Sequence, residues 1–291
     1  MRTTHNLEPG RPDTSDHIFI WLPGLLDKKE YASNKRLVED VERELGAHAI
    51  ILDLYGGDAV KPVAGKKDTH IADWHPSDVF NGIDEIVEQN RGKKFTIGGF
   101  SHGAVNALLY AAFDSGVGRN NIDRVVAVEP INFWHWDGYD ASLDAKWMLK
   151  QYKERGYVDL GTTRLEERPA IDSDPASPAM SLYITRNTIT RHTRPFERFP
   201  TNTGLPFTIT GLHESGILDY VGEETPVLIV NGENNTLTPQ AQETAYRIYD
   251  DLSHIPGTEF RTLDIEHDYR HTPEQITTVN DEVIRWMQEA A

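Results

Sequence analysis

The sequence predicts an α/β protein built on a mostly parallel, doubly wound sheet. Two observations lead to this class. Short, continuous apolar runs recur along the chain, as is typical of strands buried on both faces of a parallel sheet. Amphipathic segments with helical spacing alternate with these runs, and an alternation of strand and helix is the pattern of a parallel sheet with crossover helices.

Six apolar runs are the expected strands. They cover residues 18–22, 49–52, 95–98, 125–128, 226–232 and 260–265. Each is only a few residues long and bounded by polar residues, Gly or Pro, which favours a strand over a buried helix.

Five helices of the core are expected between and after these strands. The first has apolar residues at helical spacing over 37–45 and ends at Gly46, and the second covers 79–87 and ends near Gly92. The third covers 104–113, and the fifth covers 276–287. Thr238 and Pro239 suit the cap and first position of the fourth, which runs to 252.

The alternation stops between residues 131 and 224. We therefore expect a core formed by 1–130 and 225–291, with 131–224 inserted as a mainly helical cap that holds helices near 143–155 and 181–193. Phe133, Trp134 and Trp136 are candidates for the substrate pocket, although they could equally pack the cap on the core. The same segment holds a basic cluster that could bind an anion or form surface ion pairs: Arg186, Arg191, His192, Arg194 and Arg198.

Composition excludes several classes of function. The net charge of −17 disfavours nucleic acid and anionic membranes as partners. The chain has no Cys, which excludes a disulfide framework and a thiolate site and is compatible with the cytoplasm. Residues 1–16 are polar, and no stretch is long and apolar enough to span a bilayer, so we expect neither a signal peptide nor a membrane anchor.

The most informative motif is Gly99-Phe100-Ser101-His102-Gly103, which has the pattern G-x-S-x-G. It lies between an apolar strand and an apolar helix, and this context is what the motif requires. The arrangement predicts a tight strand-to-helix turn with Ser101 at its apex, beside the free N–H groups of a helix N-terminus.

With this motif the chain resembles the α/β-hydrolase family, and the resemblance implies a serine nucleophile, Ser101. It also implies a histidine base after the last strand. His267 occupies that place, and His271 is the competitor. By the same resemblance the oxyanion hole is formed by the backbone amides of His102 and Leu25, with Leu26 as the alternative to Leu25.

The carboxylate of the triad is less well defined. Many family members carry Asp in a G-x-x-D pattern after the second-last strand, but the matching residue here is Asn235. The acid could instead be Glu129, which follows the preceding strand, where some branches of the family carry their acid. The segment from Val128 to Trp136 is similar to that of haloalkane dehalogenases. Their activity is not implied, because they use an aspartate nucleophile where this chain has Ser101. Glu233 is a second option, and a site without a working acid is a third.

The resemblance therefore implies a cytoplasmic carboxylesterase that acts on a small-molecule ester through an acyl-enzyme and needs no cofactor or metal. Alternatives are cleavage of a thioester, amide, lactone or carbon–carbon bond, or a binding protein with a degraded triad. The spacing of His70, Asp73 and His75 could suit a metal, but no fourth ligand is in view. A homodimer is compatible with the sequence, which does not define the oligomeric state.

Overall fold

A computed structural model describes residues 15–24, 32–52, 76–130, 216–234, 241–265, 269 and 273–289. All structural statements below concern these residues. The expected cap helices, the pocket aromatics, the basic cluster and the His70–His75 motif lie outside them.

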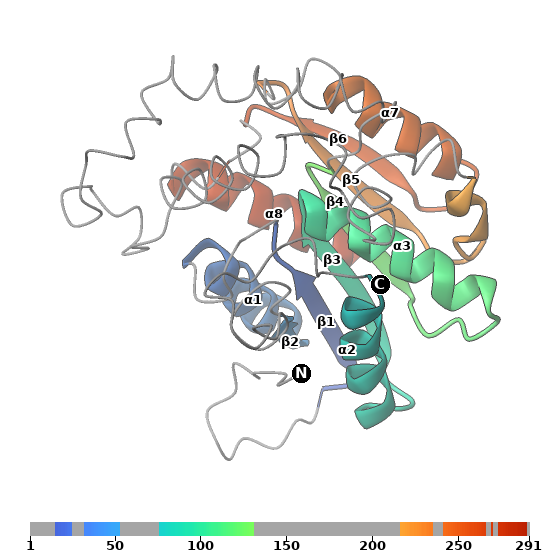
Figure 1. Ribbon diagram of the computed structural model, residues 1–291. Coiled ribbons are helices and arrows are strands. Elements are labelled where there is room, and N and C mark those ends of the chain that lie inside the picture. The colour runs from blue at the N-terminus through green and yellow to red at the C-terminus, as the bar shows by residue number, and fades with distance from the viewer. Residues whose placement is uncertain are drawn as a thin grey trace, which may run out of the picture.

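The described residues form a six-stranded sheet in the order β2-β1-β3-β4-β5-β6, and every neighbouring pair is parallel (Figure 1). The strands are β1 (His17–Leu22), β2 (His48–Ile51), β3 (Lys94–Phe100), β4 (Arg124–Val128), β5 (Val227–Gly232) and β6 (Glu259–Leu263). The strand order reverses direction along the chain after β2, as in a doubly wound sheet. The predicted fold class is confirmed.

Helices cover both faces of this sheet. One face packs against α1 (Ala32–Leu45) and α8 (Pro273–Glu289), and the other against α2 (Pro76–Gln89), α3 (His102–Gly116) and α7 (Ala241–Leu252) (Figure 1). Alternate residues of β1 show the two cores: Ile18 and Ile20 belong to the α3 side, whereas Phe19 and Trp21 belong to the α1 side. Burial on both faces explains why the strands have continuous apolar sequences.

Residues 216–224 lie at the end of the segment assigned to the cap. They include a short 3-10 helix, η5 (Ile217–Tyr220), which contacts α3 and α7. Leu218 and Val221 join the core on the α3 side. The structure therefore describes this terminal part of the insertion as packed on the sheet domain, and the cap as a whole stays a prediction.

Element ends differ in detail from the expected ones. The last strand ends at Leu263, two residues early, because Ile265 leaves the ladder and donates its amide to the Leu263 carbonyl at 2.8 Å. The helix after the motif is longer than expected and begins at His102. Gly46 ends α1 with φ 63°, in the left-handed conformation typical of a helix C-terminus. The residues expected to start the helix at 238 lie outside the described ranges.

The parallel arrangement brings the carboxyl ends of the strands to one edge of the sheet. Gly99 pairs with Leu22, and Phe100 pairs with Val128, so Ser101 and Glu129 each follow directly on paired strand residues. Ligands of such sheets bind at this edge. Within the described ranges, no helix has the length and apolar character that crossing a bilayer requires.

Candidate active site

Ser101 occupies the turn between β3 and α3. Its backbone has φ 55° and ψ −118°, which a residue with a side chain rarely adopts. Such conformations cost about 1–3 kcal/mol each and concentrate at functional sites. The side chain is 6% exposed, so the hydroxyl lies at a nearly water-free point of the sheet edge.

The two glycines of the motif are needed for steric reasons. A Cβ on Gly99 would lie 2.3 Å from the Gly103 carbonyl, and a Cβ on Gly103 would lie 2.0 Å from the Leu22 carbonyl. In both cases the obstacle is backbone, which cannot move cheaply. The glycines therefore let α3 start directly against β1 and β3, and this close packing forces the sharp turn at Ser101.

The start of α3 provides an electropositive environment for Ser101. The Ser101 carbonyl accepts the amides of Ala104 at 3.1 Å and Val105 at 3.3 Å, so the helix begins at the serine itself. Within the described part of the chain, the Ser101 hydroxyl makes no capping bond and the first turn of α3 holds no acidic residue. The N-terminal dipole of α3 is therefore directed at Ser101, and no carboxylate of the first turn of α3 opposes it.

The end of β1 lies against the same helix terminus. The carbonyls of Leu22 and Pro23 face Gly103, because a Cβ on this glycine would lie 2.0 Å and 2.4 Å from their oxygens. The chain therefore passes the start of α3 just before it reaches Leu25, which itself lies outside the described residues. His102 is the first residue of α3, so its amide belongs to the N-terminal end of this helix.

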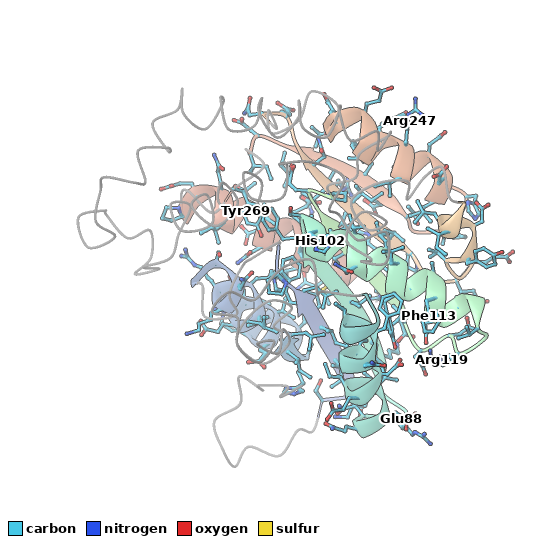
Figure 2. The ribbon with its side chains drawn as sticks, viewed as in Figure 1. Glu88, His102, Phe113, Arg119, Arg247 and Tyr269 are labelled. Carbon is cyan, nitrogen blue, oxygen red and sulfur yellow. The ribbon has the colours of Figure 1, made fainter. Side chains whose placement is uncertain are left out.

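The His102 ring is buried and held by the helix. Its Nδ1 lies 3.3 Å from Asn106 Nδ2, and the same amide group donates to the His102 carbonyl at 2.8 Å. Desolvation lowers the pKa of His102 to about 3, so the ring is neutral. Because Asn106 supplies the N–H, Nδ1 is the acceptor. Figure 2 shows His102 at the start of α3, near the middle of the molecule.

Glu129 follows β4 and has the second unusual backbone at this edge, with φ 51°. It is only 1% exposed, and its amide donates to the Val230 carbonyl at 2.8 Å. The Gly232 amide donates to Glu129 Oε1. The carboxylate therefore leans toward the end of β5, while the neighbouring Ser101 amide is held by Val128 at 2.8 Å.

Glu233 lies in a different environment. It follows β5 directly, and its amide donates to the Leu263 carbonyl at 2.8 Å, but the residue is exposed to solvent. Of the two glutamates considered as the acid, only Glu129 is buried next to Ser101.

The residues on either side of His267 are anchored at this edge. Ile265 is fully buried and its carbonyl accepts the Asn234 amide at 3.2 Å. Tyr269 is also buried, and its ring meets that of Phe100 edge-on with centroids 5.3 Å apart. Figure 2 labels Tyr269 to the left of His102 in this view.

Several expected site residues are not among those the structure describes: Leu25, Leu26, Phe133, Trp134, Trp136, Asn235, His267 and His271. Among the described residues, no three His, Asp or Glu side chains gather as a metal site requires.

The sequence alone did not indicate a role for Gly232 or Tyr269. The signal for Gly232 was its place at the end of a buried strand, but the contact with Glu129 depends on β4 and β5 being neighbours.

Comparison with known proteins gives a consistent architecture. No family model and no curated protein matches the sequence. Among solved structures, the Pyrococcus furiosus esterase Pf2001 is similar over 95% of this chain and 83% of its own, with a TM-score of 0.58 and 15% identity. Est1E from Butyrivibrio proteoclasticus, with ferulic acid bound, covers 99% of this chain and 94% of its own, with a TM-score of 0.56 and 14% identity.

A third similar structure is the thioesterase domain from the curacin biosynthetic pathway. It covers 92% of this chain and 90% of its own, with a TM-score of 0.52 and 12% identity. The chain has the α/β-hydrolase fold. In an α/β-hydrolase fold the strand-to-helix turn with G-x-S-x-G exposes its serine at the top of the sheet, and Ser101 stands at that turn.

Proposed function

We propose that the protein is a serine hydrolase that cleaves a carboxylic ester through an acyl-enzyme. In this proposal Ser101 is the nucleophile, His267 is the general base and Glu129 orients His267. The amides of His102 and Leu25 form the oxyanion hole, and the cap over residues 131–224 contributes the substrate pocket. The observation that carries the proposal is the pair of strained, buried residues at neighbouring strand ends, Ser101 and Glu129.

The backbone of Ser101 supports its role as nucleophile. A structural serine at a helix N-terminus normally uses its hydroxyl as a cap, but within the described residues this hydroxyl makes no capping bond. Instead, a strained backbone at Ser101 and two glycines that leave no room for a Cβ keep the hydroxyl at the apex of the strand-to-helix turn. A connection with only a structural role would not require a strained backbone at this position.

The anchors of the His267 loop support the role of the base. Ile265 is bonded beside β5, and Tyr269 packs on Phe100, the residue before Ser101. Because consecutive Cα atoms are about 3.8 Å apart, the Cα of His267 lies within about 7.6 Å of the Cα of each anchor. We therefore expect the His267 side chain to reach both the proposed nucleophile and Glu129.

Burial supports Glu129 over Glu233 as the acid. A triad carboxylate must hold the imidazole in one tautomer and stabilise its protonated form, which a buried and fixed carboxylate does best. Glu129 is buried and bonded to Gly232, whereas Glu233 is exposed. The proposal therefore assigns the acid to the end of β4 instead of the position of Asn235 after β5.

The reaction proceeds in two balanced halves. His267 takes the proton of Ser101 as Oγ attacks the ester carbonyl, and the two amides stabilise the developing oxyanion. The tetrahedral intermediate expels the alcohol, which receives the proton from His267. Water then attacks the acyl-enzyme with the same base, and the acid leaves as Ser101 recovers its proton. The His102 ring is neutral and buried, so its backbone amide alone takes part.

The names of similar structures include esterases and a thioesterase domain. All of these names denote acyl transfer to water, and for that reason we place oxygen esters first and thioesters second. Amides, lactones and carbon–carbon bonds belong in the same substrate panel. A binding protein without catalysis is the remaining alternative, and the retained strain at Ser101 favours an enzyme over it.

The first test measures hydrolysis of p-nitrophenyl butyrate by the wild type, Ser101→Ala and Ser253→Ala. Ser253 is an exposed serine after α7 and serves as the matched control. We expect Ser101→Ala to lower kcat at least about a thousandfold, because the nucleophile and its base act as a unit. Equal rates for wild type and Ser101→Ala would reject the hydrolase.

The acid is tested by comparing Glu129→Gln with Glu233→Gln. We expect Glu129→Gln to lower kcat on the order of a hundredfold or more, since a neutral amide does not stabilise imidazolium. Glu233→Gln should change kcat by less than about threefold, because an exposed charge that touches no reacting group contributes little. The reverse ranking would transfer the role to Glu233.

A further inference from the structure

Gly232, the last residue of β5, lies against both Glu129 and Ile265. Its amide donates to Glu129 Oε1, a bond that joins residues 103 positions apart. The carbonyl of Ile265, two residues before His267, approaches the same side of Gly232 as the carboxylate. Gly232 therefore touches both the proposed acid and the start of the loop that carries the proposed base.

The lack of a side chain at Gly232 allows these contacts. A Cβ there would lie 2.4 Å from the Ile265 carbonyl oxygen and 2.8 Å from Glu129 Oε1. Both distances are shorter than real Cβ contacts, so at least one neighbour would have to move. The Ile265 carbonyl is backbone and is also held by the Asn234 amide at 3.2 Å, so it resists displacement.

We propose that Gly232 is a positioning residue for the acid–base pair. Its amide fixes one oxygen of Glu129, and its bare Cα lets the carboxylate and the Ile265 carbonyl approach the same point. In this proposal the bond to Gly232 fixes the Glu129 carboxylate in the orientation that His267 needs. This inference rests on the proposed function, because it assigns Gly232 a role through Glu129 and His267.

The competing explanation is that Gly232 only permits β5 to end next to β6. If Gly232 were purely structural, its replacement would lower the stability of the protein by the same amount whatever residue stands at position 129. A positioning glycine acts through the Glu129 carboxylate, so its effect on catalysis should vanish once the carboxylate is absent. The two explanations therefore differ in coupling, which a double-mutant cycle measures.

The experiment introduces Gly232→Ala into the wild type and into Glu129→Gln and measures kcat and KM for p-nitrophenyl butyrate. In the wild type we expect kcat to fall on the order of 10- to 100-fold with KM changed less than about threefold, because a shift of about 1 Å misaligns the reacting groups. In Glu129→Gln the same change should cost less than about threefold further. Equal losses in both backgrounds would overturn the proposal.

Gly222→Ala is the matched control. Gly222 precedes β5 at the opposite end of the strand, and a Cβ there would lie 2.9 Å from Thr225 Oγ1 and 3.2 Å from Ser115 Oγ. Gly222 is also closely packed, although its neighbours are side-chain hydroxyls, and it lies far from the carboxyl edge. We expect kcat within about twofold of wild type, since a distant packing change leaves the transition-state contacts intact.

A second measurement does not depend on Gly232→Ala folding or on any substrate. Exchange of the Gly232 amide hydrogen is compared in wild type, Glu129→Gln and Glu129→Ala. Gln keeps an oxygen that can accept the bond and Ala does not, so we expect protection in the first two and faster exchange in Glu129→Ala. Equal exchange in all three would overturn the inference.

Titration of the His267 ring by NMR separates this inference from the hydrolase proposal. A nearby carboxylate raises the pKa of an imidazole, so we expect a lower His267 pKa in both Glu129→Gln and Gly232→Ala than in wild type. A His267 pKa that is unchanged by Gly232→Ala contradicts the positioning role. A wild type without ester turnover rejects the proposed reaction but leaves these two readouts to decide the inference.

Discussion

Ser101 and Glu129 share a feature that is rare for residues with side chains. Both have positive φ angles, 55° and 51°, and within the described residues the only other non-glycine of this kind is Asn120. Asn tolerates this region of backbone space through local hydrogen bonds, whereas Ser and Glu have less to gain from it. Strain at two adjacent strand ends therefore indicates that the positions of these two side chains matter more than the stability they cost.

The glycines around Ser101 give the first prediction at this scale. Gly103→Ala should lower the free energy of unfolding by about 3 kcal/mol or more, because the new Cβ meets backbone that cannot move away. Gly116→Ala, at the other end of α3, is the matched control, since its Cβ would lie 3.4 Å from the Tyr220 side chain. Urea unfolding measures both, and a similar cost for the two variants would contradict the close packing described here.

His102 gives a prediction for pH dependence. Its folded pKa is about 3 while the unfolded pKa is near 6.5, so the unfolded state binds a proton that the folded state does not. The stability from this group is complete above about pH 6.5 and is lost as the pH falls, by up to about 1.4 kcal/mol per unit. The variant His102→Gln keeps the backbone amide and removes this dependence of stability on pH.

The measurement is urea unfolding of wild type and His102→Gln between about pH 6.5 and about pH 4.5, where the histidine of an unfolded chain takes up its proton. The wild type should lose stability faster than the variant over this range. Parallel curves for the two proteins would mean that the ring is not kept neutral by burial.

At the scale of elements, the contact between β1 and α1 illustrates how strands and helices are joined. Trp21 is fully buried on the α1 side of the sheet, and its Nε1 donates to Asn34 Oδ1 at 2.9 Å. The bond satisfies the polar group of a large ring inside the core. It also fixes the start of α1 at the carboxyl edge of the sheet, where the proposed site lies.

Asn34→Ala should lower the free energy of unfolding by about 1–3 kcal/mol, because it leaves the indole N–H buried without this acceptor. Lys35→Ala, at an exposed position of the same helix, should change it by less than about 0.5 kcal/mol. Denaturant unfolding compares the two. Equal effects would show that the Trp21–Asn34 bond contributes nothing beyond helix propensity.

Hydropathy predicted most strands closely, and the reason is physical. A strand covered on both faces must be apolar throughout, so 125–128 was recognised and the observed β4 adds only Arg124. The same criterion failed at Ile265, which is fully buried but lies off the ladder. Burial and strand pairing are separate properties, and a hydropathy pattern reports only burial.

The motif, together with the apolar strand before it and the helix after it, predicted the turn at Ser101, because all three are local in the sequence. The bond between Gly232 and Glu129 could not be predicted in that way. It depends on β4 and β5 being adjacent, although about a hundred residues separate them in the chain. Nothing local in the sequence around Glu129 indicates its positive φ angle.

At the scale of the whole molecule, the parallel sheet assembles the site. Strands β1, β3, β4 and β5 end at one edge, and that edge brings together the start of α3, Ser101, Glu129 and the anchors Ile265 and Tyr269 (Figure 1). Helices on both faces keep the interior dry, so that polar groups at the edge interact in a low-dielectric setting.

The most direct measurement is covalent labelling with a fluorophosphonate, followed by mass spectrometry of the labelled peptide. Labelling requires an activated hydroxyl, so we expect one adduct at Ser101 in the wild type, none in Ser101→Ala, and much slower labelling in His267→Ala. A wild type that stays unlabelled, or an adduct on another serine, would contradict the claim that Ser101 is a nucleophile.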